Sequence, residues 1–187
     1  GVMSQKIDKL EKGDSFSFRG PNGRLEYMGD GVFNIKQLKS QGGEIIEKKV
    51  KNVGMIAGGT GITPMIQIIR AVLRNENDPT KLSLLFANKE ERDIILRDKL
   101  ENPDRDFSDR FEVHYTLDKA EDGWSGFTGF IDEEMIRNTM PEPSDDTLIL
   151  LCGPPKMNSE AVKPALESIG YSCLLYTSDA ADDLTRV

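Results

Sequence analysis

The stretch Val53-Gly54-Met55-Ile56-Ala57-Gly58-Gly59-Thr60-Gly61-Ile62-Thr63-Pro64 predicts a strand, a glycine turn and the start of a helix. Met55 to Ala57 is an apolar run, as in a parallel strand that is covered on both faces. Gly58, Gly59 and Gly61 remove the side chains that would keep a pyrophosphate off the backbone, and a helix start attracts anions. Because the spacing is G-x-G-x-x-P and not the dinucleotide fingerprint G-x-G-x-x-G, a tight structural turn stays open as an alternative.

A second segment of the same kind runs from Thr147 to Pro155, where an apolar strand enters a glycine-proline turn. In an open parallel sheet the carboxyl ends of all strands lie on one side, so both turns can contact one ligand. Thr63 is predicted to cap the helix after the first turn, and Pro64 suits its first turn because its missing N–H costs little there. The sequence therefore predicts one nucleotide site built from two strand–turn–helix units.

The two motifs together, GGTGITPM at 58–65 and LCGPPKM at 151–157, resemble the pyridine-nucleotide domain of the ferredoxin reductase-like flavoenzymes, in particular the NADH-cytochrome b5 reductase family. The resemblance covers about residues 1–172 and includes, in order, Met3-Ser4-Gln5, the run from Gly13 to Gly23, LLFAN at 84–88, YTLD at 115–118 and EEMIR at 133–137. It implies an α/β nucleotide-binding domain with a parallel sheet, preceded by the C-terminal part of an antiparallel β-barrel FAD-binding domain.

The same resemblance implies an oxidoreductase that transfers a hydride from NADH to FAD and then single electrons to cytochrome b5. Two alternatives stay open: the reductase module of a larger fusion such as nitrate reductase, and a nucleotide-binding module without electron transfer. In the family, an R-x-Y-[ST] motif that holds the flavin lies upstream of the segment matching Gly1. We therefore expect this chain to be a fragment that is inactive alone.

Site residues follow from the resemblance, position by position. It places FAD against Gly1, Val2, Met3 and Ser4, although Ser4 is equally an ordinary cap for a helix over 5–10. It places the NADH pyrophosphate and nicotinamide at Gly58, Gly59, Thr60 and Gly61. Thr63 is expected beside the flavin ring, and Cys152, followed by Gly153, Pro154 and Pro155, beside the nicotinamide, so Thr63 and Cys152 are the predicted catalytic residues.

Asp118 follows the predicted strand 111–117 and, by the resemblance, lies at the adenosine ribose. A carboxylate there accepts hydrogen bonds from a 2′-hydroxyl and repels a 2′-phosphate, which favours NADH over NADPH. Composition alone would favour a solvated loop acid at this position. Cys152 has a second interpretation as a small apolar filler, and His114, in the middle of its strand, is interpreted as structural.

Bulk properties exclude several classes of function. The net charge of −8 over 187 residues argues against nucleic-acid binding, and two cysteines with one histidine form no metal-site pattern. No apolar run is long enough to span a bilayer, so membrane attachment is expected only through a segment upstream of Gly1. By resemblance, we expect a monomer on the cytoplasmic face of the endoplasmic reticulum or on the mitochondrial outer membrane.

The pattern along the chain divides it into three parts. Residues 1–45, rich in turns and aromatic residues, are expected to belong to the barrel, and 46–172 to the NAD-binding domain. Strands are predicted at 52–57, 82–87, 111–117 and 147–152. Helices are predicted at 64–74, over the apolar residues of 94–100, after Asp132, and from Lys156 to a stop at Gly170.

The last fifteen residues, 173–187, are expected to be a non-native tail. Cys-Leu-Leu-Tyr-Thr-Ser-Asp-Ala-Ala-Asp, at 173–182, is what a common transposase sequencing adapter encodes in one reading frame. Such a segment has no selected reason to pack. We therefore predict that it forms no part of the fold, and that the sheet lacks the edge strand that ends it in the family.

Overall fold

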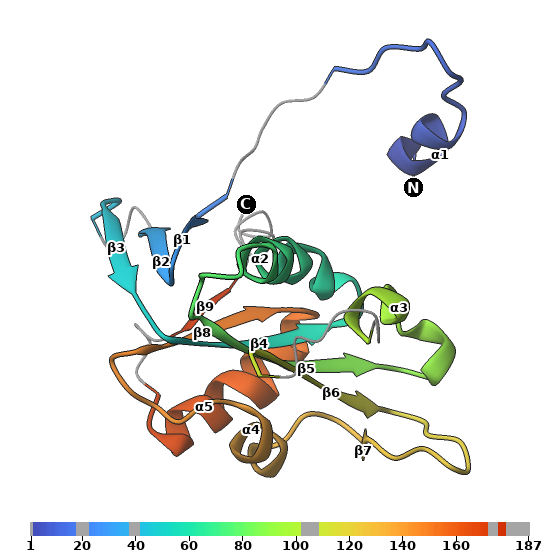
Figure 1. Ribbon diagram of the computed structural model, residues 1–187. Helices are drawn as coiled ribbons and strands as arrows, with labels where there is room; N and C mark the ends of the chain where they lie inside the picture. Colours follow the sequence, from blue (N-terminus) through green and yellow to red (C-terminus); the bar gives the residue numbers. More distant parts are fainter. Residues whose placement is uncertain (1, 18–22, 38–41, 102–108, 172–175, 179–187) are drawn as a thin grey trace.

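A six-stranded sheet forms the centre of the protein, and a three-stranded antiparallel sheet precedes it along the chain (Figure 1). The computed structural model describes residues 2–17, 23–37, 42–101, 109–171 and 176–178. The small sheet has the order β1-β2-β3 and the large sheet the order β7-β6-β5-β4-β8-β9. The strands are β1 Leu25–Gly29, β2 Val32–Lys36, β3 Ile45–Lys49, β4 Asn52–Gly58, β5 Lys81–Asn88, β6 Phe111–Leu117, β7 Phe127–Thr128, β8 Thr147–Cys152 and β9 Tyr176–Ser178.

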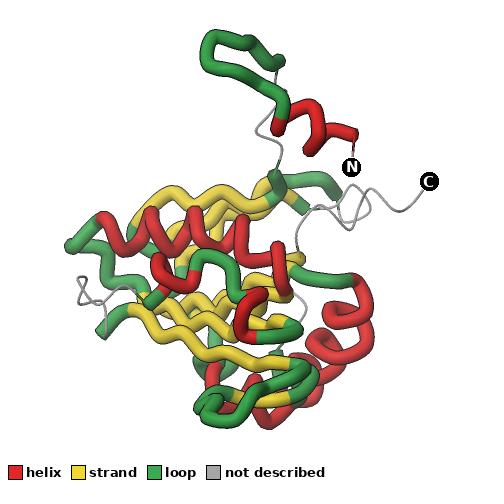
Figure 2. Tube along the Cα trace, turned by 90° about the vertical axis from the view of Figure 1, so that its right-hand side faces the viewer, coloured by secondary structure: helices red, strands yellow, loops and turns green. Residues whose placement is uncertain are grey.

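Every pair of neighbours in the large sheet is parallel, which confirms the predicted α/β class. The central strands β4 and β8 are buried along almost their whole length, because helices cover both faces. Helix α2 (Ile62–Arg74) covers one face, while α4 (Glu133–Thr139) and α5 (Lys163–Ile169) cover the other (Figures 1 and 2). Two separate apolar cores result, one on each side of the sheet.

The predicted helices agree with the structure at their apolar faces and differ in detail. The residues over 94–100 do not form one helix: after the short η3 turn (Glu91–Asp93), Leu96 adopts a left-handed conformation with φ 60°, and α3 spans only Arg97–Leu100. The last helix contains a π-helical segment over Met157–Val162 before α5. Asp132 caps α4 as predicted, since its Oδ1 accepts a hydrogen bond from the amide of Met135 at 2.8 Å.

The outermost strand of the large sheet differs from the prediction about the tail. Residues Tyr176–Ser178 form β9, which pairs in parallel with β8 through Ile149, Leu150 and Leu151. The prediction that no residue after 172 joins the sheet is therefore wrong for these three residues. An edge strand needs only backbone hydrogen bonds, which any sequence can supply. Residues 173–175 and 179–187 lie outside the described part of the chain.

The small sheet is held to the large one through a hairpin. Its turn, Asp30-Gly31, joins β1 to β2 with φ 49° and φ 73°, the positive values that a tight two-residue hairpin turn requires. Strand β3 continues this sheet to Lys49, past the boundary expected after residue 45. Phe33 of β2 is fully buried and belongs to the same core as α2, so an apolar side chain of the hairpin packs into the NAD-binding unit.

Phe33→Ala is expected to lower the free energy of unfolding by about 3–5 kcal/mol, because it deletes a buried ring and leaves a cavity between the two sheets. The measurement is urea unfolding followed by circular dichroism. Met28→Ala, at a 57% exposed position on β1, is the matched control and is expected to change stability by no more than about 0.5 kcal/mol. Equal effects of the two changes would contradict the shared core.

Candidate nucleotide-binding site

The two glycine motifs meet at the carboxyl edge of the large sheet. Strands β4 and β8 are neighbours, with Ala57 paired to Cys152, so the turns that follow them emerge side by side. The first turn is the 3₁₀ segment η2 (Gly59–Gly61), which leads into α2, and the second contains Gly153, Pro154 and Pro155. Convergence of the motifs was predicted from the sequence, and the strand register now places them together.

Close backbone approach explains two of the glycines in these motifs. A Cβ atom on Gly61 would lie 2.1 Å from the carbonyl oxygen of Cys152, and one on Gly153 would lie 3.1 Å from the amide nitrogen of Gly58. These residues are glycine because the two turns press against each other. Gly59 differs from both, because its φ is +53° and an added Cβ atom would have no neighbour within 4 Å, so clearance for a pyrophosphate stays a prediction at this glycine.

Thr63 does not cap α2, contrary to prediction. The helix starts at Ile62 with Gly61 before it, so Thr63 stands within the first turn and its hydroxyl donates to the carbonyl of Thr60 at 3.0 Å. The preceding 3₁₀ turn begins the helix two residues earlier than the capping pattern indicated. Thr60 and Thr63 are both exposed.

The second motif presents Cys152 and two exposed prolines. Cys152 is half-buried at the end of β8, and Pro154 and Pro155 are exposed at the start of the next helix. The buried Asn158 in the π-helix steadies this turn, because its Nδ2 donates to the carbonyl of Gly153 at 3.2 Å. A π-helical segment is frequent at functional sites, and here it fixes the turn beside Cys152.

Asp118 lies at the same edge as the motifs, at the end of β6. Its side chain is exposed, and its amide donates to the carbonyl of Asn88 at 3.0 Å. The strand order β6-β5-β4-β8 places Asp118 and Cys152 three strand spacings apart, roughly 14 Å. The predicted residues therefore form a strip along the edge, with Asp118 at one end, the glycine turn in the middle and Cys152 at the other end.

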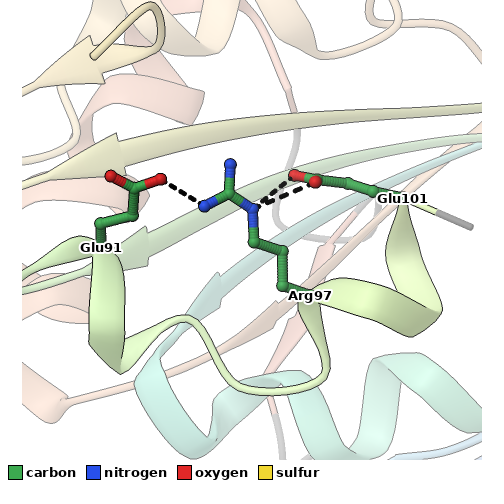
Figure 3. Close-up of polar contacts among 3 residues, drawn as sticks. All are labelled: Glu91, Arg97 and Glu101. Carbon is green, nitrogen blue, oxygen red and sulfur yellow. Dashed lines mark hydrogen bonds and ion pairs between the residues drawn. The ribbon is translucent and has the colours of Figure 1, made fainter. Parts of the chain in front are cut away.

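A cluster of charged and aromatic side chains lies next to β6, and Figure 3 shows its charged members Glu91, Arg97 and Glu101; we call this cluster the wall. Arg97 contacts Glu91 through Nη1 and, through Nε, both carboxylate oxygens of Glu101 at 3.0 Å. Its guanidinium also lies 5.9 Å from the ring centres of Tyr115 and Trp124. Burial raises the pKa of Tyr115 well above its ordinary value, so this ring stays neutral. The cluster fixes the η3–α3 segment. Within it, the positive charge of Arg97 is neutralised by its ion pairs with Glu91 and Glu101.

Sequence reasoning missed two residues at this edge. The side-chain amide of Asn88, at the end of β5, is buried with no hydrogen-bond partner on either atom, a state that a ligand or an ordered water relieves. Phe130 is 81% exposed and follows Gly129, whose amide donates to the carbonyl of Leu117. A polar residue at the end of a buried apolar strand was the available signal for Asn88. Phe130 carried no signal, because exposure is not visible in a sequence.

The residues predicted to contact FAD are not brought to this strip. Val2 and Met3 belong to α1 (Val2–Asp8), are 72% and 55% exposed, and lie apart from both sheets (Figure 1). Ser4 stands inside α1 and does not begin a helix over 5–10, so its expected role as a cap is wrong. Gly1 lies outside the described residues. The assignment of these four residues to FAD stays a prediction.

A comparison with protein families identifies the unit that carries the strip. The family model of the oxidoreductase NAD-binding domain matches residues 55–163, which include both glycine motifs and Asp118. The chain belongs to the oxidoreductase NAD-binding domain family. This NAD-binding domain has curated relatives among the NADH-cytochrome b5 reductases. Reductase 3 of Rattus norvegicus is 52% identical over 171 residues, and reductase 1 of Homo sapiens is 49% identical over 172 residues.

These matches cover 91% and 92% of the chain and 56% of each relative, so the chain spans little more than half the length of the relatives. They confirm the resemblance recognised in the sequence. Among solved structures, the cytochrome b5 reductase domain of Ulva prolifera nitrate reductase superposes with a TM-score of 0.85 at 38% identity, over 95% of this chain and 65% of that one. The human Ncb5or domains, at 24% identity and a TM-score of 0.65, share the fold.

Two further observations concern the described ranges alone. Within them, no three His, Cys, Asp or Glu side chains are grouped so that they could hold a metal ion. None of the helices in those ranges combines the length and apolarity that crossing a membrane requires.

Gly61→Ala is expected to destabilise the NAD-binding domain by about 1–3 kcal/mol or more, because the added methyl group meets the Cys152 carbonyl and the two turns must separate. Gly59→Ala is the matched comparison: its methyl group meets no atom, so only the left-handed backbone adds a cost of about 1–2 kcal/mol. We expect Gly59→Ala to weaken NADH binding, measured by titration calorimetry, more than its loss of stability explains. Normal NADH binding by the folded Gly59→Ala variant would contradict an open phosphate site at Gly59.

Proposed function

We propose that this chain supplies the NADH-binding half of an FAD-dependent oxidoreductase that passes single electrons to cytochrome b5. The observation that carries the proposal is the strip at the carboxyl edge of the sheet, where the open Gly59 backbone lies between Asp118 and Cys152. The relatives named NADH-cytochrome b5 reductase support the reaction class. When bound, FAD supplies the conversion of a two-electron hydride donor into a one-electron source.

The proposed roles follow the order of the strip. The Gly59 turn and the start of α2 hold the pyrophosphate, because a helix start carries partial positive charge and Gly59 leaves the backbone accessible. Asp118 accepts hydrogen bonds from the adenosine ribose, and the exposed ring of Phe130 offers a stacking surface for adenine. Cys152 and its Gly-Pro-Pro turn border the nicotinamide. Thr63 would then face the flavin that accepts the hydride.

The partner and location are part of the same proposal. We infer a monomer that binds cytochrome b5 at the cytoplasmic face of the endoplasmic reticulum or at the mitochondrial outer membrane, held there through a segment outside this chain. One alternative has specific support: the solved structure that superposes with this chain is the cytochrome b5 reductase domain of a nitrate reductase, and is therefore a module of a larger enzyme. The two alternatives share the NADH strip and differ in the acceptor.

The test uses this chain extended upstream by the flavin-binding half that its relatives carry. NADH is mixed anaerobically with the FAD-loaded protein, flavin absorbance is followed by stopped flow, and purified cytochrome b5 is then added. Flavin bleaching followed by saturable reduction of cytochrome b5 is the expected result, and ferricyanide serves as a control acceptor that needs no docking. Nucleotide binding without bleaching would identify a binding module instead. Bleaching with ferricyanide turnover but none with cytochrome b5 would favour the fusion module.

The charges around the adenosine end favour NADH over NADPH. Asp118 repels a 2′-phosphate, and Arg97, the guanidinium of the adjoining wall, is already paired with Glu91 and Glu101. Lys119 follows Asp118 and is exposed, but the neighbouring carboxylate offsets its charge. Among the described residues, the Asp118 carboxylate and the pairing of Arg97 therefore disfavour a doubly charged phosphate at this position.

Asp118→Thr is expected to raise kcat/KM for NADPH by at least roughly tenfold, which corresponds to ~1.4 kcal/mol of transition-state binding. The change removes the repulsion, keeps a hydroxyl that can bond the ribose, and leaves Lys119 to attract the phosphate. The comparison is kcat/KM for NADH and NADPH with ferricyanide, in wild type and variant. An unchanged ratio of the two constants would make Asp118 a solvated loop acid.

A further inference from the structure

A buried carboxylate joins the small sheet to the NAD-binding domain at the edge opposite the nucleotide strip. Asp78 lies in the loop between α2 and β5 and is 1% exposed. Its Oδ1 accepts from the amide and hydroxyl of Thr80 at 3.0 and 2.6 Å. Its Oδ2 accepts from the Tyr27 hydroxyl and, at 3.2 Å, from the Asp30 amide, both in the β1–β2 hairpin. Each carboxylate oxygen therefore has two donors, half of them from the other sheet.

Tyr27 is the second half of this contact. Its hydroxyl donates to Asp78 and accepts from the amide of Gly31 at 3.2 Å, while its ring contacts Phe33 with a centroid distance of 4.8 Å. Burial raises the pKa of Tyr27, and the hydrogen bond to Asp78 adds to the effect. Burial opposes ionisation of Asp78 as well, but the hydrogen bonds from Thr80 and Tyr27 bring its pKa below the ordinary value. The Tyr27 side chain is therefore a neutral phenol that donates a hydrogen bond to the ionised carboxylate of Asp78.

Both sides of the contact are rigid. The loop that carries Asp78 is held by Arg110, whose Nη1 donates to the carbonyls of Asn75 and Asp78 at 3.1 and 2.9 Å. On the hairpin, the Gly31 carbonyl accepts from the Val50 amide at 2.8 Å, at the junction of β3 and β4. A Cβ on Gly31 would lie 2.0 Å from the Val50 carbonyl oxygen, so the turn is in direct backbone contact there. The hairpin turn is thus fixed at one end.

The remaining contacts of the hairpin are apolar, and they do not by themselves set the tilt of the small sheet relative to the large sheet. Phe33 and the partly buried Leu25, Tyr27 and Ile35 pack on the α2 core through apolar surface, and such packing has no preferred direction. Hydrogen bonds have preferred directions, so the polar contacts of Tyr27 and Asp78 are the ones that can define how the small sheet is tilted.

We propose that Tyr27 and Asp78 are positioning residues that set the orientation of the flavin-bearing sheet relative to the bound NADH. This inference rests on the proposed function and on the predicted assignment of residues 1–45 to the flavin-binding barrel. The chain upstream of β1 leaves from the open end of the hairpin. A five-residue strand spans roughly 16 Å, so a tilt of about 4° at the turn moves that end by about 1 Å. A misplacement of about 1 Å can slow a reaction on the order of 100-fold.

Tyr27→Phe tests the proposal, with Tyr171→Phe as the matched control. Tyr171 is also buried, at 3% exposure, and its hydroxyl donates to the Pro141 carbonyl, but both residues belong to the NAD-binding domain. In the flavin-loaded, extended protein we expect Tyr27→Phe to lower the rate constant of flavin reduction by NADH at least roughly tenfold, with the NADH Kd unchanged within about twofold. Tyr171→Phe is expected to leave both constants unchanged. Equal rate constants in Tyr27→Phe and wild type would overturn the proposal.

A second measurement on the 187-residue chain needs no flavin. Residual dipolar couplings report the orientation of β1-β2-β3 relative to the large sheet, and we expect Tyr27→Phe to change it and Tyr171→Phe to preserve it. Asp78→Asn is a second variant with the same expected change, because its NH₂ group must face two donors whichever way the amide turns. An unaltered orientation in Tyr27→Phe would overturn the proposal even if wild type shows no flavin reduction. Absence of flavin reduction in wild type, with a changed orientation in the variant, would count against the proposed function alone.

Discussion

The arrangement of the site depends on one backbone contact, between Gly61 after β4 and the carbonyl of Cys152 at the end of β8. A methyl group on Gly61 would lie 2.1 Å from that oxygen, so the two turns can meet only without a side chain there. Because they meet, α2 begins directly beside the second motif, and Gly59 is left facing open space. The parallel register of β4 and β8 sets the level of the two turns, and the glycines set their separation.

The carboxyl and amino ends of the strands in the large sheet carry different contacts. The carboxyl edge carries the nucleotide strip, from the exposed Asp118 to the half-buried Cys152. The amino edge carries the buried contact between Asp78 and the hairpin, where every oxygen of the carboxylate has donors. Between them lie two apolar cores that hold the sheet rigid. The nucleotide strip at one edge and the attachment of the small sheet at the other can therefore change independently, while the large sheet keeps their distance fixed.

Local sequence predicted the central strands well, since β6 and β8 have the expected bounds and β4 and β5 extend them by one or two residues. Apolar runs between turn residues are a sufficient signal for strands that are buried on both faces. Prediction failed where local preference met a tertiary demand. The apolar run around Leu96 favours a helix, but the clamp of Arg97 by Glu91 and Glu101 accompanies a left-handed break. Thr63 has the composition of a cap, yet a 3₁₀ turn starts the helix before it.

The sequence by itself determined the fold class, the two glycine motifs and the candidate residues Gly59, Thr63, Asp118 and Cys152. The fold class and the motifs follow from chain-local patterns, namely buried runs and glycine turns, whereas the roles of the four residues follow from the resemblance to the reductase family. Only the tertiary structure decided which glycine of the first motif faces open space, that Asn88 and Phe130 share the same edge, and that Tyr27 reaches Asp78 across 51 positions of sequence. The physical reason is that burial and hydrogen-bond partners depend on which strands become neighbours, and the order of strands in a sheet is fixed by packing of the whole chain.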